Sequence, residues 1–452
     1  MIWLPMILTF GGTIFIYENR FLTGAFFILI SVLIAYFSSF DNFFIAKRKD
    51  ILVFSLFFFL SYAAFHEIVK HALNADIFRY FRDVLFILVI VIYFATYFRG
   101  FLYISRTKLL ILSVPALGVL GILLSHDEFM ALWSFRDSYL YSVCALLAAA
   151  IASREVLIKF SYLLVSIALV NLVVGFSQQL GSQEYWISIG YGEIATSVWQ
   201  GMQRPWGTFD RSLTYGHFLL FSSILGFFVL RMPFVGTLLL LGAYLSFNRS
   251  VLVSSILVTF AVVFSDAYRS SRAISIALVI LGGIFIYPLI DSVLLSLFDP
   301  EFRSNSERIS DYIAILSLGL PDLLTGGYMG LIGSNAGRFS LTAEFTSGIA
   351  HIHSGYLTLI LELGLVGALL FLIIILMLFI KHIRAVSKYE KVSILLIFLM
   401  FALSMFTHNM QSNIPNNIFF WAFIGLFSIY YARSQQEGQP HRTGTPGKYR
   451  KQ

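Results

Sequence analysis

The sequence predicts an all-α polytopic membrane protein, and three observations carry this prediction. Of 452 residues, 58% are hydrophobic and 12% are charged, whereas a soluble globular chain carries about 25% charged residues. The mean hydropathy is +0.83. The apolar runs are continuous rather than alternating, and with their flanks they reach the roughly 20 residues that a membrane-spanning helix needs. Helices are expected because they satisfy their own backbone hydrogen bonds in lipid.

Residues 1–178 are predicted to form the N-terminal transmembrane helices. The opening "MIWLPMILTFGGTIFIY" lacks a basic stretch and a small-residue cleavage site, so it is expected to be the first span rather than a signal peptide. The single cysteine, Cys144, excludes an intrachain disulfide and a Cys-rich metal site. The spans are expected at residues 2–17, 21–40, 51–65, 84–98, 109–124, 139–153 and 156–178.

Two long outer loops divide the rest of the chain. They are residues 179–216, which carry Arg204 and Arg211, and residues 291–353. Loops of this length in a compact protein are usually functional or disordered, and their aromatic content argues against disorder. The intervening central helices (217–290) are expected at 217–230, 233–247, 251–265 and 274–290, and the C-terminal helices (354–432) at 355–380, 392–408 and 418–432.

Some of these spans are short, and re-entrant pairs among them would lower the count, so the sequence supports about 12 to 14 transmembrane helices. In the second outer loop, "NSERISDYIAILSLGLPDLL" has the apolar spacing of an amphipathic helix that begins near Ser306 and stops at Gly319–Pro321. Such a helix is expected to lie at the membrane–water boundary. The polar tail 433–452 contains Pro and Gly and is expected to be disordered and cytoplasmic.

The distribution of lysine and arginine sets the expected orientation, because cytoplasmic loops are enriched in both. It places both termini inside. The predicted cytoplasmic set is Lys47, Arg48, Lys49, Arg99, Arg106, Lys108, Arg154, Arg231, Arg269, Arg272, Lys381, Arg384, Lys388, Lys391 and the tail from Arg433.

The outer loops hold one lysine, Lys70, but ten arginines: Arg20, Arg79, Arg82, Arg136, Arg204, Arg211, Arg249, Arg303, Arg308 and Arg338. Each of them has two possible roles. It either binds a lipid headgroup or pairs with Asp or Glu, or it belongs to a binding site for an anionic substrate. As a set they predict a phosphate site, because the planar guanidinium binds phosphate with two parallel hydrogen bonds.

Several common motifs are absent from the chain. It has no Asp-x-Asp pair for a metal-dependent sugar transferase, no Gly-rich P-loop and no Gly-x-Ser-x-Gly elbow. "HEIVKH" at 66–71 differs from a zinc-binding signature because its histidines are five residues apart, about 140° around a helix. No metal and no cofactor are therefore expected.

The segment "AHIHSGYLTLILELGLVG" (350–367) places two histidines directly before an apolar run. A neutral histidine accepts a proton near pH 7, so His351 or His353 is a candidate general base. Glu362 follows nine residues after His353 and is expected to face the bundle interior, where it is paired or meets a wet cavity. Histidine and arginines together predict transfer from a lipid-diphosphate donor to a hydroxyl acceptor outside the cytoplasm.

Three sequence blocks and one further loop, between residues 200 and 370, resemble the O-antigen polymerase and ligase family of bacterial envelope enzymes. "HSGYLTLILELGLVG" (353–367) has that family's spacing of His, Ser and two Gly residues. "NRSVLVSSILVTF" (248–260) resembles its central helix, although Asn rather than Ser precedes the arginine. The third block is "RPWGTFDRSLTYGHFL" (204–219), and the further loop has Arg308 ahead of "PDLLTGGYMG". The first 180 residues match only as hydrophobic helices.

The resemblance implies a membrane-embedded glycosyltransferase fold in the bacterial inner membrane and a metal-independent reaction. The donor would be an undecaprenyl-diphosphate-linked glycan and the acceptor a glycan or lipid A–core. A chain-length regulator and membrane lipids are the other expected partners, and nucleic acid is not one. The implied catalytic residues are His353 at the acceptor hydroxyl and Arg204, Arg211 and Arg308 at the diphosphate; the expected substrate-binding residues are Arg249, His351, Ser354, Arg338 and Glu362.

The sequence favours a polymerase of glycan repeat units, with an O-antigen ligase as the alternative. Some polymerases have Arg, ten residues and Gly in two outer loops. Arg308 and Gly319 have this spacing, whereas Arg204 and Gly216 miss it by one residue. A lipid-linked glycan flippase or other transporter is the alternative outside the enzymes: it would explain the helices and the buried Glu362, but the chain shows no internal repeat.

Overall fold

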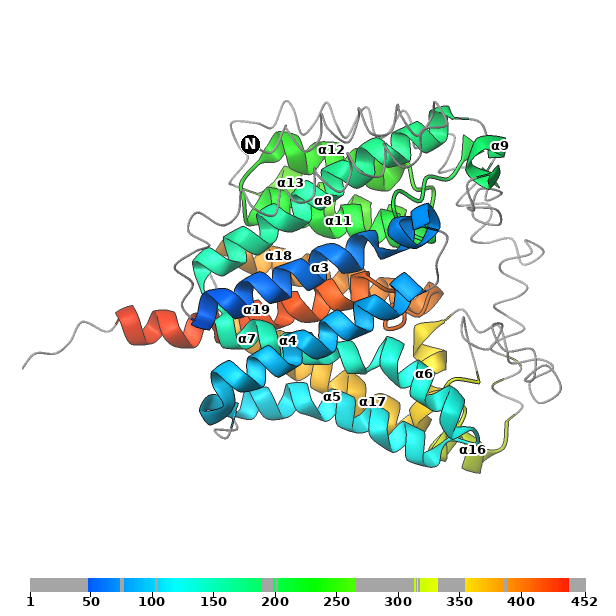
Figure 1. The fold of residues 1–452 in the computed structure, drawn as a ribbon, viewed down its shortest axis with the longest axis vertical. Coiled ribbons are helices and arrows are strands. Elements are labelled where there is room, and N and C mark those ends of the chain that lie inside the picture. Colours follow the sequence, from blue (N-terminus) through cyan, green and yellow to red (C-terminus); the bar gives the residue numbers. More distant parts are fainter. Residues whose placement is uncertain are drawn as a thin grey trace, which may run out of the picture.

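The computed structural model shows a bundle of long helices (Figure 1). It describes residues 48–73, 77–101, 105–181, 183–188, 198–199, 202–265, 313, 315, 318–331, 354–385 and 388–438. The predicted spans at 2–17, 21–40 and 274–290 lie outside this part of the chain.

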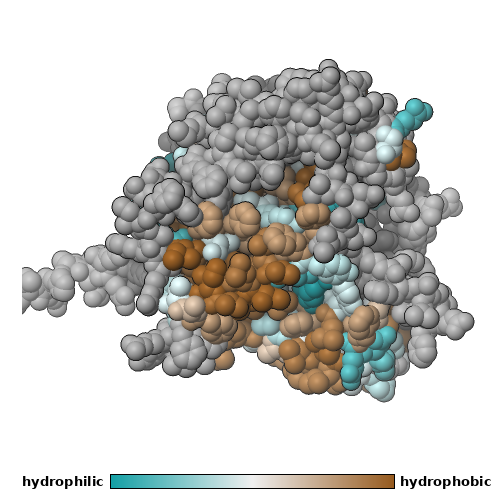
Figure 2. Space-filling view, in the orientation of Figure 1, coloured by the Kyte–Doolittle hydropathy of each residue, from teal (hydrophilic) through white to brown (hydrophobic). Residues whose placement is uncertain are grey.

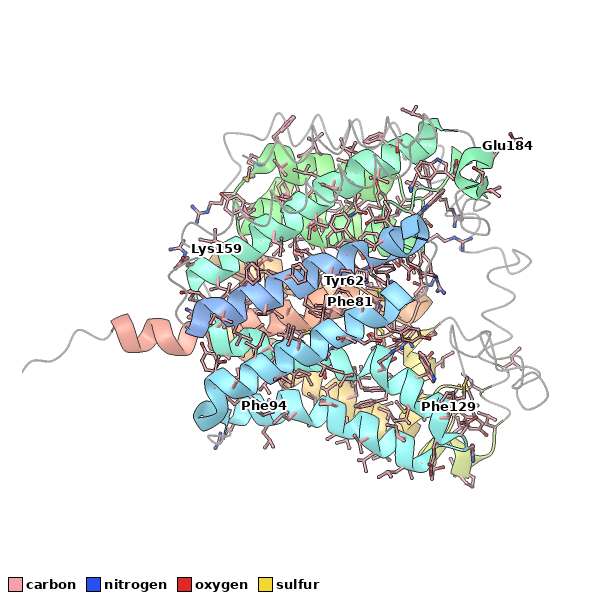
Figure 3. All side chains as sticks on the ribbon, in the orientation of Figure 1. Tyr62, Phe81, Phe94, Phe129, Lys159 and Glu184 are labelled. Atoms are coloured by element: carbon pink, nitrogen blue, oxygen red, sulfur yellow. The ribbon has the colours of Figure 1, made fainter. Side chains whose placement is uncertain are left out.

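Helices α3 (Arg48–Leu73) and α4 (Ile77–Phe101) form an antiparallel pair at the start of the described chain. The rings of Tyr62 and Phe81 meet edge to face with centroids 5.2 Å apart (Figure 3). α5 (Arg106–Leu124) follows. These three helices contain the predicted spans 51–65, 84–98 and 109–124, and each is longer than its prediction.

The predicted span 139–153 is helical, but in two parts, a 3-10 turn and a short α-helix. α6 (Glu128–Ser138) is followed by a 3-10 turn, η2 (Leu140–Ser142), and then by α7 (Val143–Ile151). With 11 residues, α6 is only about 16 Å long. It carries charged and hydroxyl side chains, so it is not part of a continuous apolar run. α8 (Arg154–Leu180) is then continuous and largely buried.

The first outer loop is shorter than predicted, because α8 extends to Leu180 and α11 begins at Ser212. It contains the short helix α9 (Gln183–Trp186) and a two-stranded antiparallel ladder, β1 (Val198–Trp199) and β2 (Met202–Gln203).

Three shorter apolar helices follow the loop. They are α11 (Ser212–Phe228), α12 (Pro233–Tyr244) and α13 (Arg249–Phe264). Proline in the first turn of α12 suits that position, because a backbone N–H there would have no intrahelical acceptor and nothing is lost without it. The three helices correspond to the predicted spans 217–230, 233–247 and 251–265.

The last described part contains α16 (Leu320–Thr325), α17 (Gly355–Ala385), α18 (Lys388–Thr407) and α19 (Asn416–Gly438). Residues 313 and 315, in the predicted amphipathic helix, are helical, and Gly319 is not. A second short helix, α16, begins at the next residue, Leu320. α19 extends past residue 432 into the predicted tail, because the added residues up to Gly438 are mostly good helix formers.

Successive long helices run in opposite directions, so the loops between them lie at the two ends of the bundle. One end, the α6 end, holds α6, α9 and α16 on the right of Figure 1. α3, α5, α8 and α18 run toward it, whereas α4, α11, α17 and α19 run away from it. The helices that run toward the α6 end begin with basic residues that the sequence assigns to the cytoplasm: Arg48 in α3, Arg106 in α5 and Arg154 in α8. Lys381 of α17 contacts Thr107 at the start of α5.

Six of the described helices are long and apolar enough to cross a membrane: α3, α4, α5, α8, α17 and α18. The apolar parts of α11, α12, α13 and α19 are shorter. α4 and α17 expose large apolar side chains such as Val84, Leu88, Val366 and Leu369, and Figure 2 shows hydrophobic residues gathered on one face. A monomeric soluble protein rarely exposes such a surface. The predicted fold class, an all-α polytopic membrane protein, is confirmed.

Candidate functional site

A loop that carries two of the predicted site arginines is bound tightly to α8 at the α6 end. The Oε1 atom of Gln178 accepts hydrogen bonds from the backbone N–H of Trp206 at 2.9 Å and of Gly207 at 2.8 Å. Its Nε2 atom donates to the Gly207 carbonyl at 2.7 Å. Gln178 is fully buried. Its side-chain amide supplies hydrogen-bond partners to buried backbone groups of the loop, which have no partners from a helix or strand.

Asn171, about two turns before Gln178 in α8, holds the same loop. The Oδ1 atom of Asn171 accepts from the backbone N–H of Thr208 at 2.8 Å and lies 2.9 Å from its hydroxyl. The hydroxyl also lies 3.0 Å from the carbonyl of Ala64 in α3. Gly207 adopts a positive φ of 62°, and a Cβ there would collide with Asn171 and Tyr215. The Gly-Thr pair of this block is therefore required by the backbone.

Arg204 lies at the start of this loop and is half-buried. Its Nε atom is buried and has no hydrogen-bond partner among the residues that the structure describes. Burial lowers the pKa of the Arg204 guanidinium, but an arginine keeps its charge at any physiological pH. Among the described residues no ion pair is formed by Arg204, and a half-buried cation of this kind is suited to bind an anion.

Arg211 occupies the N-cap position of α11, seven residues after Arg204. Its Nε atom lies 3.8 Å from Asp210 Oδ2, and its side chain is 57% exposed. Exposed ion pairs of this length contribute little free energy, so an anionic ligand competes readily for this guanidinium. Arg249 is the first residue of α13, and the residue before it, Asn248, contacts Ser212 at the start of α11.

Ser354 is the first described residue of the histidine block. Its hydroxyl is buried and donates to the carbonyl of Met405 at 3.4 Å. Gly355, which begins α17, lies so close to Met405 and to the His408 carbonyl that a Cβ would not fit. The start of α17 is thus fixed against the end of α18. Four predicted site residues lie outside the described residues: Arg308, Arg338, His351 and His353.

Glu362 is buried inside the bundle, as the sequence predicts. Its Oε1 atom accepts a hydrogen bond from Ser134 Oγ at 2.6 Å, and its Oε2 atom accepts one from Tyr139 Oη at 2.8 Å. Both partners belong to the end of α6 and the residue after it. Two hydroxyl donors therefore occupy the two oxygens of the carboxyl group.

α17 is interrupted two residues after Glu362, at Gly364, where φ is 69°. The segment that follows α16 fills the interruption: the backbone N–H of Tyr328 donates to the Leu361 carbonyl at 3.1 Å. A Cβ on Gly364 would collide with the Leu324 carbonyl. Glycine is needed here for both reasons.

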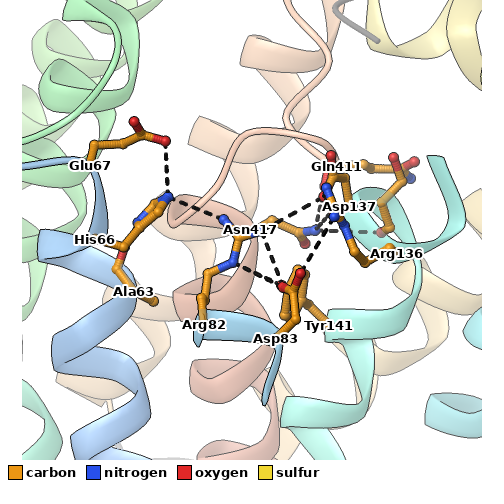
Figure 4. A network of polar contacts seen from close by, with 11 residues as sticks. Ala63, His66, Glu67, Arg82, Asp83, Arg136, Asp137, Tyr141, Gln411 and Asn417 are labelled. Carbon is orange, nitrogen blue, oxygen red and sulfur yellow. Dashed lines mark hydrogen bonds and ion pairs between the residues drawn. The ribbon is translucent and has the colours of Figure 1, made fainter. Parts of the chain in front are cut away.

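A buried network of charged groups lies at the α6 end and was not singled out from the sequence (Figure 4). It is formed by two Arg-Asp pairs, one in α4 and one in α6. Arg82 Nε lies 3.3 Å from Asp83 Oδ1, and its Nη2 atom lies 3.9 Å from Asp137 Oδ1. Arg136 Nη2 lies 2.9 Å from Asp137 Oδ1, and its Nη1 atom lies 3.4 Å from Asp83 Oδ2.

Two further groups complete the contacts of Arg82. Its Nε atom donates to Tyr141 Oη at 2.9 Å, and Tyr141 donates to Asp83 at 2.5 Å. Its Nη1 atom donates to Nε2 of His66 at 3.2 Å, while Nδ1 of the same histidine contacts the Ala63 carbonyl. Arg82 and Arg136 are thus matched by two aspartates. Among the predicted outer arginines, these two pair with buried or partly buried aspartates, whereas Arg211 has one long, exposed contact with Asp210. Arg204 and Arg211 are therefore the better candidates for an anionic ligand.

The sequence contained a signal for this network: the tripeptide Phe-Arg-Asp occurs twice, at 81–83 and 135–137. The Nδ1 atom of His66, the first histidine of "HEIVKH", contacts the Ala63 carbonyl, and its Nε2 atom lies 3.2 Å from Arg82 Nη1 and 3.1 Å from Glu67 Oε1. The described part of the chain contains no group of three or more His, Cys, Asp or Glu side chains that could hold a metal ion.

Comparison with protein-family models finds no match, and comparison with curated proteins finds none either. The roles assigned to Arg204, Arg211 and the histidine block therefore rest on sequence motifs and on the geometry described above.

Proposed function

We propose that the protein is a glycosyltransferase that polymerises undecaprenyl-diphosphate-linked oligosaccharide repeat units at the outer face of the bacterial inner membrane. The single observation that carries the proposal is the environment of Arg204. It is half-buried at one end of a membrane bundle, its Nε has no hydrogen-bond partner among the described residues, and its loop is fixed by Gln178 and Asn171. Such a preorganised cation stabilises the negative charge that develops on a diphosphate leaving group.

The α6 end faces the outside in this proposal, and both termini face the cytoplasm. Support comes from the basic residues with which the helices that run toward the α6 end begin, including Arg48, Arg106 and Arg154, because cytoplasmic loops are rich in lysine and arginine.

The reaction follows from the residue types at this end. The acceptor hydroxyl oxygen attacks the anomeric carbon of the donor glycan, and His353 takes the hydroxyl proton. The bond between that carbon and the diphosphate oxygen breaks, and the electron pair leaves with undecaprenyl diphosphate. Arg204, Arg211 and Arg308 bind the diphosphate in place of a metal ion.

Deletion of the gene followed by gel analysis of the surface polysaccharide tests this function. A lost polymerase leaves lipid A–core capped with a single repeat unit. Bare core with accumulating lipid-linked chains would instead assign the protein as a ligase. A normal ladder of chain lengths would contradict both.

One observation favours a transporter as the second candidate. α17 is interrupted at Gly364 beside the buried Glu362, and α6 is a short helix that contacts this carboxylate. Interrupted helices and buried carboxylates occur at the substrate and ion sites of secondary transporters. Purified protein that moves a lipid-linked glycan across a vesicle membrane, and forms no new glycosidic bond, would establish this candidate.

A further inference from the structure

His66 lies where α3 and α4 meet at the α6 end, and its imidazole has two partners with opposite requirements (Figure 4). Its Nε2 atom lies 3.2 Å from Arg82 Nη1 and 3.1 Å from Glu67 Oε1. Its Nδ1 atom lies 2.9 Å from the Ala63 carbonyl. His66 is 3% exposed and Arg82 is 2% exposed, so little water competes for these contacts.

The contact with Arg82 fixes the position of the proton on a neutral His66. A guanidinium only donates hydrogen bonds, so Arg82 bonds to Nε2 only when that nitrogen carries a lone pair. The proton is then on Nδ1, which donates to the Ala63 carbonyl. In this form His66 accepts a hydrogen bond from the next helix and joins α3 to α4.

The contact with Glu67 requires the opposite state of Nε2. A carboxylate only accepts hydrogen bonds, so it bonds to Nε2 only when this nitrogen is protonated. The imidazole is then a cation, because Nδ1 keeps the proton that it donates to Ala63. Two cations face each other at 3.2 Å, and the hydrogen bond from Arg82 is replaced by repulsion. Histidine is the side chain whose charge ordinarily changes between about pH 5 and 8.

The other partners of Arg82 determine which helix it leaves when His66 is protonated. Asp83 of α4 lies 3.3 Å from its Nε atom, and Asp137 of α6 lies 3.9 Å from its Nη2 atom. Tyr141 of η2 accepts from Nε at 2.9 Å. These three groups hold the guanidinium on the side of α6, so the contact that is lost is the one with α3.

Glu67 connects the buried imidazole to a group that water reaches. Its Oε2 atom lies 3.7 Å from Lys70 Nζ, and the side chain of Lys70 is 23% exposed. Other charged or titratable groups on the elements around α3 include Tyr62 of α3 itself, Arg136 of α6, Arg204, Asp210 and Arg211 of the loop bound to Ala64, and Arg154, Glu155 and Lys159 at the opposite end of α8.

We propose that His66 is a pH-sensitive switch at the α6 end of the bundle. When neutral it joins α3 to α4 through Arg82, and when protonated it pairs with Glu67 and releases Arg82. The first turns of α4 then keep one polar link to α3, from the Tyr62 hydroxyl to the Phe78 carbonyl at 2.6 Å. In the orientation proposed above this end faces the outside, so the switch responds to the pH outside the cytoplasm.

Hydrogen exchange followed by mass spectrometry tests the switch in the purified full-length protein in lipid nanodiscs. Peptides from the first turns of α4 are compared at about pH 5 and about pH 8, the limits of the ordinary range of histidine. The rates are corrected for the intrinsic pH dependence of amide exchange. Wild-type α4 should exchange about 10-fold faster at the lower pH, as expected for loss of one hydrogen bond to a charged group.

Two variants and a control identify the responsible group. His66→Gln keeps an acceptor for Arg82 but does not titrate, so α4 should be equally protected at both pH values. Glu67→Gln removes the partner of the protonated imidazole and leaves the Arg82 contact in place, so the midpoint should move to lower pH. His126→Gln changes a histidine between α5 and α6 whose ring contacts Tyr328, and it should behave as the wild type does.

Other outcomes overturn the switch. Equal protection of wild-type α4 at both pH values would show that protonation does not release Arg82. A pH response that persists in His66→Gln, or that disappears in His126→Gln, would assign it to a different group. If His66→Gln does not fold, Glu67→Gln decides, because an unchanged midpoint would contradict the pairing of protonated His66 with Glu67. Hydrogen exchange needs no substrate, so these outcomes are independent of glycan transfer.

Discussion

Gln178 and Gly207 bind each other through two hydrogen bonds that close a ring between α8 and the Arg204 loop. The N–H of Gly207 donates to Gln178 Oε1 at 2.8 Å, and Gln178 Nε2 donates to the Gly207 carbonyl at 2.7 Å. This pairing attaches the loop to a continuous buried helix. Arg204 is therefore presented in one arrangement, which lowers the entropy lost when it binds a ligand.

Gly207→Ala is expected to destabilise the protein by about 1–3 kcal/mol, because alanine is strained at this positive φ and its Cβ would collide with Asn171 and Tyr215. Thermal unfolding in detergent measures the effect. Gly226→Ala is the control: a Cβ there meets Gly236 at 3.2 Å without a positive φ, so its effect should be smaller. Equal Tm values for the two variants would show that the turn at Gly207 is not required.

Arg204→Ala is expected to lower kcat/KM for glycan transfer strongly while leaving the Tm unchanged, because Arg204 Nε has no hydrogen-bond partner among the described residues. Removal of one donor at a developing charge costs about 100- to 1,000-fold in rate. Arg204→Lys should recover little, since an ammonium keeps the charge but not the planar fork. Full activity of the lysine variant would mean that Arg204 contributes only a long-range field.

Arg82→Ala provides the contrasting arginine. Its guanidinium is buried with Asp83, Tyr141 and His66 as partners, so its removal leaves two aspartates with Arg136 as their one remaining arginine partner among the described residues. A loss of about 3–5 kcal/mol is expected, with poor recovery of folded protein in size-exclusion chromatography. A well-folded Arg82→Ala variant would argue that the network is not structural.

His353→Ala is expected to abolish transfer in protein that still folds, because loss of a general base costs about 100- to 10,000-fold in rate. Glycan banding on gels, with expression checked by blotting, measures the effect. His351→Ala should be milder, since it lies two residues before the matched position. Normal banding of the His353 variant would remove this residue from catalysis.

Glu362→Leu is expected to destabilise the bundle, because Ser134 and Tyr139 would lose their acceptor in a buried position. Each unsatisfied hydroxyl costs about 1–3 kcal/mol. Glu362→Gln keeps a carbonyl oxygen in the same place and should cost less. The two Tm values decide the matter: equal losses would mean that the carboxyl group acts through something other than these two hydroxyls.

Excess EDTA is expected to leave glycan transfer unchanged, because the proposed mechanism neutralises the diphosphate with arginines. A magnesium-dependent transferase assayed in the same buffer controls for effective chelation. Loss of activity that Mg²⁺ or Mn²⁺ restores would contradict the arginine mechanism and would direct attention to the carboxylates of the outer loops.

Hydrophobic run length alone predicted most of the described helices, since lipid requires continuous apolar segments. The predicted span at 139–153 contains a 3-10 turn, η2, before α7 rather than one continuous α-helix. Run length is insensitive to such a break. The burial of Glu362 was predicted from its depth in an apolar run, but its partners were not, because Ser134 and Tyr139 are more than 200 residues away in sequence.

The Phe-Arg-Asp repeat shows a second limit. Arg82 and Arg136 were grouped with the other outer arginines because charge counting treats each residue alone. Their neutralisation depends on a contact between α4 and α6 that no local pattern encodes. The adjacent aspartate in each tripeptide was the available clue.

The same adjacency bears on how the chain enters the membrane during synthesis. Arg82 and Asp83 are neighbours in α4, and Arg136 and Asp137 are neighbours in α6. Each segment therefore carries its own counter-ion before any partner helix is present, which reduces the penalty for moving charge toward lipid. Only after both segments are inserted does each arginine gain a second contact, with the aspartate of the other helix. Insertion of one helix at a time and later assembly of the bundle are thus compatible with buried charge.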